Sequence, residues 1–186
     1  FGEKACVIGA SGSGKTTLMK FVAGLQHDVE GSVRVYHLDN EIELPRKSDL
    51  FHYLSQDPYI FHGSVRENIC GFEALSATQQ EYYESLCELD WLASAVSSLP
   101  DGFNTEIVPA GSGLSGGQIQ RVCLARRLFS LPYGGILILD ESTSALDTVT
   151  EAEVVEYLIN RSDITLLMIS HSKEVWNKFD KKIQVK

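Results

Sequence analysis

The sequence has few cysteines, and none of them are paired in a way that would suggest a metal site. Its four cysteines, Cys6, Cys70, Cys87 and Cys123, are widely spaced and form no CxxC pattern. A disulfide framework needs many cysteines in a short chain, and a zinc site needs closely spaced pairs, so the sequence supports neither. We expect four reduced, buried thiols in a reducing compartment.

Long apolar runs and clusters of basic residues are also missing. A membrane-spanning helix needs about 20 consecutive apolar residues, whereas the longest runs here, at 136–139 and 164–169, have the length of strands. Lysine and arginine together number 16 against 25 acidic residues, which gives a net charge of −9. This balance argues against a surface that neutralises nucleic-acid phosphates, so we expect no nucleic-acid partner.

The length and composition of the chain are those of one globular domain. The chain has 186 residues, of which 44% are hydrophobic and 22% are charged. A chain of this size can bury a core of its own. The sequence opens at Phe1 rather than at methionine, so we expect a trimmed piece of a longer protein.

Strand and helix patterns alternate at both ends of the chain and give way to helical patterns in the middle. The apolar and alternating patterns predict strands at 4–8, 32–38, 51–55, 136–139, 164–169 and 182–185. Helical spacing of apolar residues predicts helices at 15–25, 79–92, 118–129 and 150–159. We therefore predict a single α/β domain over 1–186, with a mainly parallel sheet in 1–62 and 132–186 and a helical insertion at 63–131.

A glycine-rich loop follows the first predicted strand and precedes the first helix. Residues 9–16 read GASGSGKT. Gly9, Gly12 and Gly14 allow the backbone to curl so that its N–H groups converge on phosphate oxygens. Lys15 supplies a positive charge, and the hydroxyl of Thr16 is suited to Mg²⁺. The strand–loop–helix context indicates a nucleotide phosphate site rather than a chance turn.

Two acids follow the apolar run at 136–139. Asp140 and Glu141 come at the carboxyl end of a predicted buried strand, where α/β sheets bind ligands. One acid in such a place is often only a helix cap, but two in succession are harder to explain in that way. We predict that Asp140 holds Mg²⁺ and that Glu141 is the general base for an attacking water.

A second glycine-rich turn precedes the helix predicted at 118–129. Residues 114–118 read LSGGQ, in which a serine hydroxyl and free N–H groups at a helix start again suit an anion. The chain has one complete nucleotide constellation but two such helix starts, so we predict that the second serves the nucleotide of a partner subunit. On the residues alone, Gln56 is an ordinary loop glutamine and His171 an ordinary surface histidine.

These motifs occur in the order of the ATP-binding-cassette (ABC) ATPases, and the whole chain resembles that family. The resemblance implies a P-loop NTPase (RecA-like) fold with an incomplete antiparallel β-subdomain, and a motor that uses ATP and Mg²⁺. It implies ATP contacts from Gly9, Ala10, Ser11, Gly12, Ser13, Gly14, Lys15, Thr16, Thr17 and the Q-loop residue Gln56. It implies catalysis by Glu141, the switch histidine His171 and Lys15, and metal contacts from Thr16, Gln56 and Asp140. Contacts to the partner's ATP would come from the signature residues Ser115, Gly116, Gly117 and Gln118 and from Asp147 of the D-loop.

Finer features are similar to the exporter branch of the family, in the style of bacterial peptide, toxin or bacteriocin exporters. The stretch 59–69 and the segment 99–106 carry this likeness, whereas Pro109-Ala110 departs from the acid that exporters usually have in the X-loop. The implied partners are the transmembrane domain of an exporter and a second ABC domain in a homodimer, at the cytoplasmic face of a membrane. The alternatives are a soluble ABC ATPase that acts on nucleic acid or the ribosome, an importer ATPase, and a nucleotide-dependent module that does not hydrolyse ATP. The aromatic residue on which the family stacks adenine has no counterpart here, so we expect weaker ATP affinity.

Overall fold

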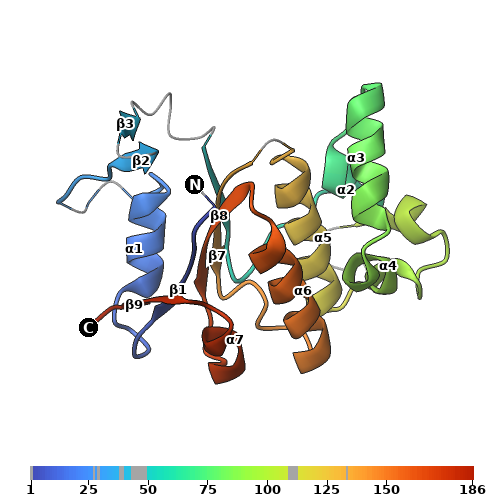
Figure 1. Cartoon of the computed structure of the whole chain (residues 1–186). Coiled ribbons are helices and arrows are strands. Elements are labelled where there is room, and N and C mark those ends of the chain that lie inside the picture. The colour runs from blue at the N-terminus through green and yellow to red at the C-terminus, as the bar shows by residue number, and fades with distance from the viewer. Residues whose placement is uncertain are drawn as a thin grey trace. The chain divides into compact units, whose positions relative to one another are not determined.

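The computed structural model describes residues 2–26, 28, 30–37, 40–42, 50–108, 113–132 and 134–186. The chain divides into two units, whose segments can be followed by residue number in Figure 1. Unit 1 comprises residues 1–53, 133–141 and 156–186, and unit 2 comprises residues 54–132 and 142–155. Within the described ranges, no helix combines the length and the apolar character needed to cross a membrane.

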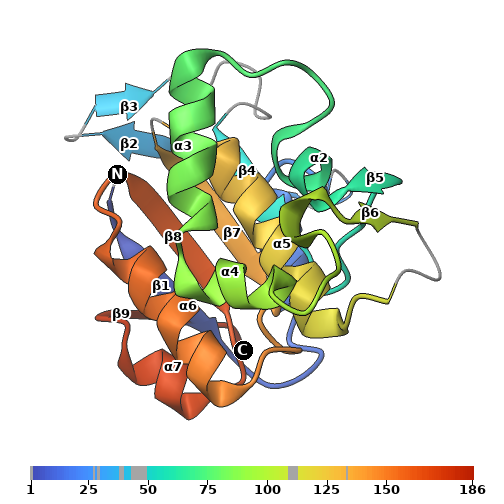
Figure 2. The same ribbon diagram turned by 90° about the vertical axis from the view of Figure 1, so that its right-hand side faces the viewer.

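Unit 1 is built on a five-stranded sheet in the order β4-β7-β8-β1-β9. The strands are β1 (Lys4–Ile8), β4 (Phe51–Leu54), β7 (Gly135–Asp140), β8 (Ile164–Ile169) and β9 (Lys181–Gln184). β1 pairs in parallel with β8 and β9, and β7 pairs in parallel with β8. Figure 2 shows these strands side by side. The predicted α/β class with a mainly parallel sheet is confirmed.

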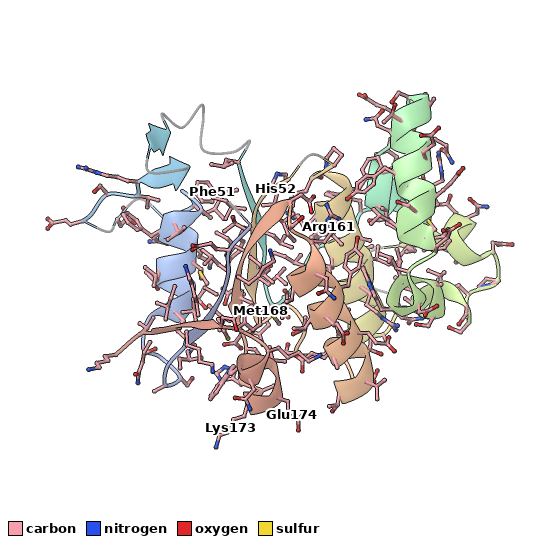
Figure 3. All side chains as sticks on the ribbon, in the orientation of Figure 1. Phe51, His52, Arg161, Met168, Lys173 and Glu174 are labelled. Atoms are coloured by element: carbon pink, nitrogen blue, oxygen red, sulfur yellow. The ribbon has the colours of Figure 1, made fainter. Side chains whose placement is uncertain are left out.

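The core of unit 1 lies between the sheet and α1 (Lys15–Val22). Met19 and Ala23 pack on Val7, Ile138 and Ile169 of the strands. α1 is shorter than the predicted 15–25, because the N–H of Leu25 donates to the carbonyl of Lys20 in a closing turn. Phe51 and Met168 are buried, and Figure 3 shows that Lys173 and Glu174 of α7 (Lys173–Asn177) extend outward.

Unit 1 also holds a two-stranded antiparallel ribbon. It joins β2 (Val35–His37) to β3 (Asn40–Ile42). The predicted strand at 32–38 is therefore observed over a shorter span, with residue 38 outside the described residues. The sequence pattern gave no sign of β3.

Unit 2 is mainly helical. It contains β5 (Gly63–Ser64), α2 (Val65–Cys70), α3 (Ala77–Cys87), α4 (Asp90–Val96), the 3-10 turn Gly102–Asn104, β6 (Glu106–Ile107) and α5 (Gly116–Phe129). α5 packs against α2, α3 and α4. Its core is made of fully buried aliphatic side chains, among them Leu92, Ala95, Val122, Ala125 and Leu128.

Two local features of unit 2 differ from the sequence prediction. The helical stretch predicted at 79–92 is broken into α3 and α4, because Leu89 has an extended conformation and starts a new helix. The break allows both Leu86 and Leu92 to be buried. A short antiparallel pair, β5 with β6, was not predicted, because two-residue strands leave no periodic signal.

α6 (Thr148–Asn160) starts in unit 2 and ends in unit 1. The predicted helix at 150–159 is thus confirmed, with two additional residues at its start and one at its end. Val154, Val155 and Leu158 are completely buried, as their helical spacing indicates.

Candidate nucleotide-binding site

In unit 1 a tight loop joins β1 to α1. Gly12 and Gly14 have φ angles of 78° and 90°, values that residues with a Cβ rarely adopt. The N–H of Ser13 donates to the carbonyl of Ala10 at 3.2 Å, which closes the turn. Since α1 begins directly after Gly14, its free N–H groups and positive dipole end face the loop. This is the geometry of an anion site.

Lys15 is the buried cation of this loop, with 6% of its surface exposed. Its Nζ atom donates to the carbonyl oxygens of Gly9 at 3.1 Å and Ala10 at 2.9 Å. Both acceptors are neutral, so the ammonium group keeps its charge available for an anion. The neighbouring Ser11, Thr16 and Thr17 are exposed.

Asp140, at the end of β7, has each carboxylate oxygen bound by a hydroxyl group. Thr16 donates through Oγ1 to Oδ1 at 3.0 Å, and Tyr53 donates through its hydroxyl to Oδ2 at 2.5 Å. Asp140 is 4% exposed. Burial, together with the hydrogen bond to Asp140, raises the pKa of Tyr53 above its ordinary value, so its hydroxyl stays protonated and donates. Tyr53 was not among the predicted site residues.

Glu141 and His171 form a second polar pair in unit 1. Nε2 of His171 lies 2.8 Å from Oε1 of Glu141, and the His171 side chain is 56% exposed against 22% for Glu141. Glu141 has a φ of 52°, which is costly for a residue with a side chain. Its N–H donates to the carbonyl of Ile169 at 3.3 Å. The carboxylate is thus held at the strand terminus with a histidine as its neighbour.

Unit 2 carries the second glycine-rich helix start. Ser115 is the N-cap of α5, and its Oγ accepts from the N–H of Gln118 at 3.2 Å. Oε1 of Gln118 accepts from the N–H of Ser115 at 2.7 Å, and its Nε2 donates to the carbonyl of Ala95 at 2.7 Å. These bonds fix the turn in place while Ser115 and Gly116 stay exposed.

The same unit holds the predicted D-loop against this helix start. A Cβ added at Gly117 would lie 2.9 Å from the carbonyl oxygen of Ala145. Gln120, which is 5% exposed, accepts from the N–H of Ala145 at 3.0 Å and donates to the carbonyl of Gln56 at 3.3 Å. Gln120 was missed from the sequence, since a helix glutamine has no motif of its own.

Asp147 and Gln56 complete the predicted set in unit 2. Oδ1 of Asp147 accepts from the N–H groups of Val149 and Thr150, and Oδ2 accepts from the Thr150 hydroxyl at 2.7 Å. Asp147 therefore caps α6. Gln56 is exposed and lines a small pocket of about 230 Å³ together with Gly116, Gln120 and Ala145.

The structure thus divides the predicted residues between the two units. Lys15, Thr16, Asp140, Glu141 and His171 lie in unit 1, whereas Gln56, the signature residues and Asp147 lie in unit 2. Phe1, Pro109 and Ala110 lie outside the described residues. All four cysteines are free, as expected, but Cys70 and Cys87 are only partly buried; burial raises the pKa of Cys6 to about 11.

Comparison with known proteins shows the family of the chain. The family model described as ABC transporter matches residues 1–144. The chain is 37% identical over 185 residues to a probable microcin-H47 secretion/processing ATP-binding protein of Escherichia coli, covering 99% of this chain and 26% of that protein. It is 37% identical over 181 residues to a transport/processing ATP-binding protein of Streptococcus pneumoniae, covering 97% of this chain and 25% of the relative.

A solved structure shows the same fold. The structure of a bacterial Atm1-family ABC exporter with ATP bound superposes with a TM-score of 0.81 at 27% identity, and covers 100% of this chain and 32% of the exporter chain. The chain therefore spans about a quarter of the length of the curated relatives named above. The matched family model, the identity to these relatives and the shared fold together show that the chain belongs to the ABC transporter family.

Proposed function

We propose that the chain is the ATP-hydrolysing motor domain of an ABC exporter, in which two copies share ATP. The observation that carries this proposal is the cluster in unit 1. A buried lysine in a glycine loop, a buried aspartate and a glutamate–histidine pair are all held at the carboxyl ends of neighbouring strands.

The chain's own groups suit phosphoryl transfer to water, which depends on positioning and charge stabilisation. Lys15 and the N-terminus of α1 would bind the β- and γ-phosphates. Glu141 would accept a proton from the attacking water. His171, whose Nε2 lies 2.8 Å from Oε1 of Glu141, would hold the Glu141 carboxylate in place. The left-handed backbone at Glu141 fixes the direction in which this carboxylate leaves the strand.

The residues present also fit a magnesium ion bound together with ATP. Mg²⁺ prefers oxygen ligands and is usually held by one or two carboxylates plus the phosphates of a substrate. Asp140 and the hydroxyl of Thr16, 3.0 Å apart, offer such oxygens. In the described parts of the chain, no cluster of three or more histidine, cysteine or acidic side chains could hold a metal alone. Mg²⁺ would supply charge neutralisation on the phosphates.

The second copy would contribute the helix start of α5. Ser115, Gly116 and Gly117 form an exposed or half-exposed turn whose cap is already built by Gln118. The bonds from Gln120 and the close approach of Gly117 to Ala145 join the signature turn to the D-loop within unit 2. The segments expected to contact the partner's ATP, including Asp147, would therefore move as one body.

A groove on unit 2 supports a membrane-embedded partner. The guanidinium group of Arg126 lies 4.6 Å from the ring centre of Phe61 and donates to the carbonyl of Tyr59 and to the side chain of Asn68. Tyr59, Phe61 and Phe72 are 63%, 45% and 63% exposed, and Phe61 and Phe72 line a groove of about 550 Å³. Exposed aromatic rings beside a groove suit a docking helix, so we assign this surface to the cytoplasmic end of an exporter's transmembrane domain.

The names of two relatives suggest the cargo. One is named for microcin-H47 secretion and another for colicin V secretion. We propose by analogy that the exporter carries a peptide or small protein and that this domain works at the cytoplasmic face of the membrane.

The test of the proposed activity is the steady-state ATPase rate of the natural protein. Glu141→Gln keeps the size of the side chain and removes the base, so turnover should fall by about a hundredfold or more while ATP binding persists. Glu73→Gln, the same change at an exposed position, is the control and should retain full activity. Unchanged turnover in Glu141→Gln would refute the assignment of the base, and absence of ATPase activity in the unsubstituted protein would refute the motor function.

A further inference from the structure

Asp140 is a nearly buried carboxylate whose two oxygens are bound by different elements of unit 1. Thr16, from α1, donates to Oδ1 at 3.0 Å, and Tyr53, from β4, donates to Oδ2 at 2.5 Å. A buried carboxylate that loses a donor is strongly destabilised. The orientation of Asp140 therefore depends on Tyr53 as much as on Thr16.

Tyr53 is well placed to hold that orientation. β4 is the neighbour of β7 in the sheet, and the N–H of Ile136 donates to the carbonyl of Leu50 at 2.9 Å. The ring of Tyr53 packs on the core cluster that includes Phe51, Ile136 and Ile138. Because packing fixes the ring, its hydroxyl can approach Asp140 from one direction only.

The two carboxylate oxygens of Asp140 therefore have different partners. Tyr53 occupies Oδ2, and Oδ1 is left on the side of Thr16, where the glycine loop begins its helix. Partners that bind a metal ligand from behind orient the ligand and tune its basicity, and their removal typically weakens metal affinity by about 10- to 100-fold.

We propose that Tyr53 is a positioning residue that fixes Asp140 for the metal ion bound with ATP. The proposal rests on the proposed function, because it needs Asp140 to contact that metal. In this role Tyr53 would act through Asp140, to which it donates a hydrogen bond, and would not itself be a ligand of the metal. It also lies on the strand that leads into Gln56, so it connects the start of the Q-loop to the aspartate.

The test replaces Tyr53 by phenylalanine in the natural protein, which removes the hydroxyl and keeps the ring. Mn²⁺ is titrated, as a probe for Mg²⁺, into protein saturated with a non-hydrolysable ATP analogue, and free Mn²⁺ is followed by its electron paramagnetic resonance signal. Tyr53→Phe should weaken Mn²⁺ binding by about tenfold. The affinity for the analogue measured in EDTA should not change, because Lys15 and the glycine loop are intact.

The matched control is Tyr157→Phe, which removes a hydroxyl in unit 1 that accepts from Arg161 at 3.1 Å. It should leave Mn²⁺ binding unchanged. Unchanged Mn²⁺ affinity in Tyr53→Phe would overturn the proposal, as would a loss of analogue affinity in EDTA, which would reveal a merely structural role. If instead the unsubstituted protein binds no Mn²⁺ with the analogue, the proposed function itself fails.

Discussion

At the scale of single residues, the site residues in unit 1 depend on contacts from other segments of the chain. Glu141 combines a positive φ of 52° with a contact to His171 at 2.8 Å. A backbone of this kind costs free energy and persists only where the surrounding structure imposes it. The structure therefore holds the Glu141 carboxylate in this direction at a cost in stability.

The ionisation of Asp147 is coupled to the stability of the fold. Hydrogen bonds from the N–H and hydroxyl of Thr150 hold the pKa of Asp147 below its ordinary value. Its stabilising effect is therefore complete above the ordinary aspartate pKa of about 3.9 and is lost as the pH falls towards the lower native value. Asp147→Asn keeps an acceptor oxygen but cannot titrate.

We therefore expect the wild-type protein to lose more stability than Asp147→Asn when the pH falls below the ordinary aspartate pKa of about 3.9 and towards the lower native pKa of Asp147. Urea unfolding midpoints at several pH values measure the difference. Glu81→Gln, which removes one negative charge from an exposed position, should retain the wild-type pH dependence. If the stability of the wild type and of Asp147→Asn changes equally with pH, the Asp147 carboxylate contributes no pH-dependent stability.

At the scale of elements, the start of α5 and the segment around Ala145 are packed with very little space between them. A Cβ at Gly117 would meet the carbonyl oxygen of Ala145 at 2.9 Å, whereas a Cβ at Gly116 would meet the Ala145 side chain at 3.4 Å. A Cβ atom is essentially never found as close to a carbonyl oxygen as the first contact would require, whereas the second distance is an ordinary van der Waals contact. The two adjacent glycines thus differ in what they tolerate.

Gly117→Ala should accordingly lower the free energy of unfolding by about 1–2 kcal/mol, because overpacking outweighs the better helix propensity of alanine. Gly116→Ala should be neutral or slightly stabilising. Urea denaturation measures the free energy of unfolding of both variants, and each variant serves as the control for the other. Equal midpoints for the two variants would mean that α5 and Ala145 are not in close contact.

The elements also show which features a sequence can predict. β7 and α6 were predicted because a run of buried aliphatics and a helical apolar stripe leave clear patterns. The break at Leu89 was not, since both sides of it are helical in composition. The β5–β6 pair was missed because its register depends on residues 63–64 meeting 106–107, far along the chain.

At the scale of the whole molecule, motif order was sufficient to predict the family, because LSGGQ between a phosphate loop and a strand ending in two acids is a specific combination. Contacts between distant segments were not predictable. Tyr53 and Asp140 are 87 positions apart, and nothing in the local sequence of either residue indicates the other. Gln120 likewise gains its role only when α5 lies beside Ala145.

If two copies of the chain share ATP, the phosphate loop of one copy should lie close to the signature turn of the other, and cysteines placed in these two segments should cross-link. Ser11→Cys and Gly116→Cys are made in separate samples of the natural protein, which are mixed, supplied with Mg-ATP and mildly oxidised. Both positions are exposed, and the unsubstituted protein controls for its own cysteines. Shared ATP should give a covalent pair of copies on a denaturing gel, formed only in the mixture and only with ATP. No such pair, in samples where each variant still binds ATP, would contradict it.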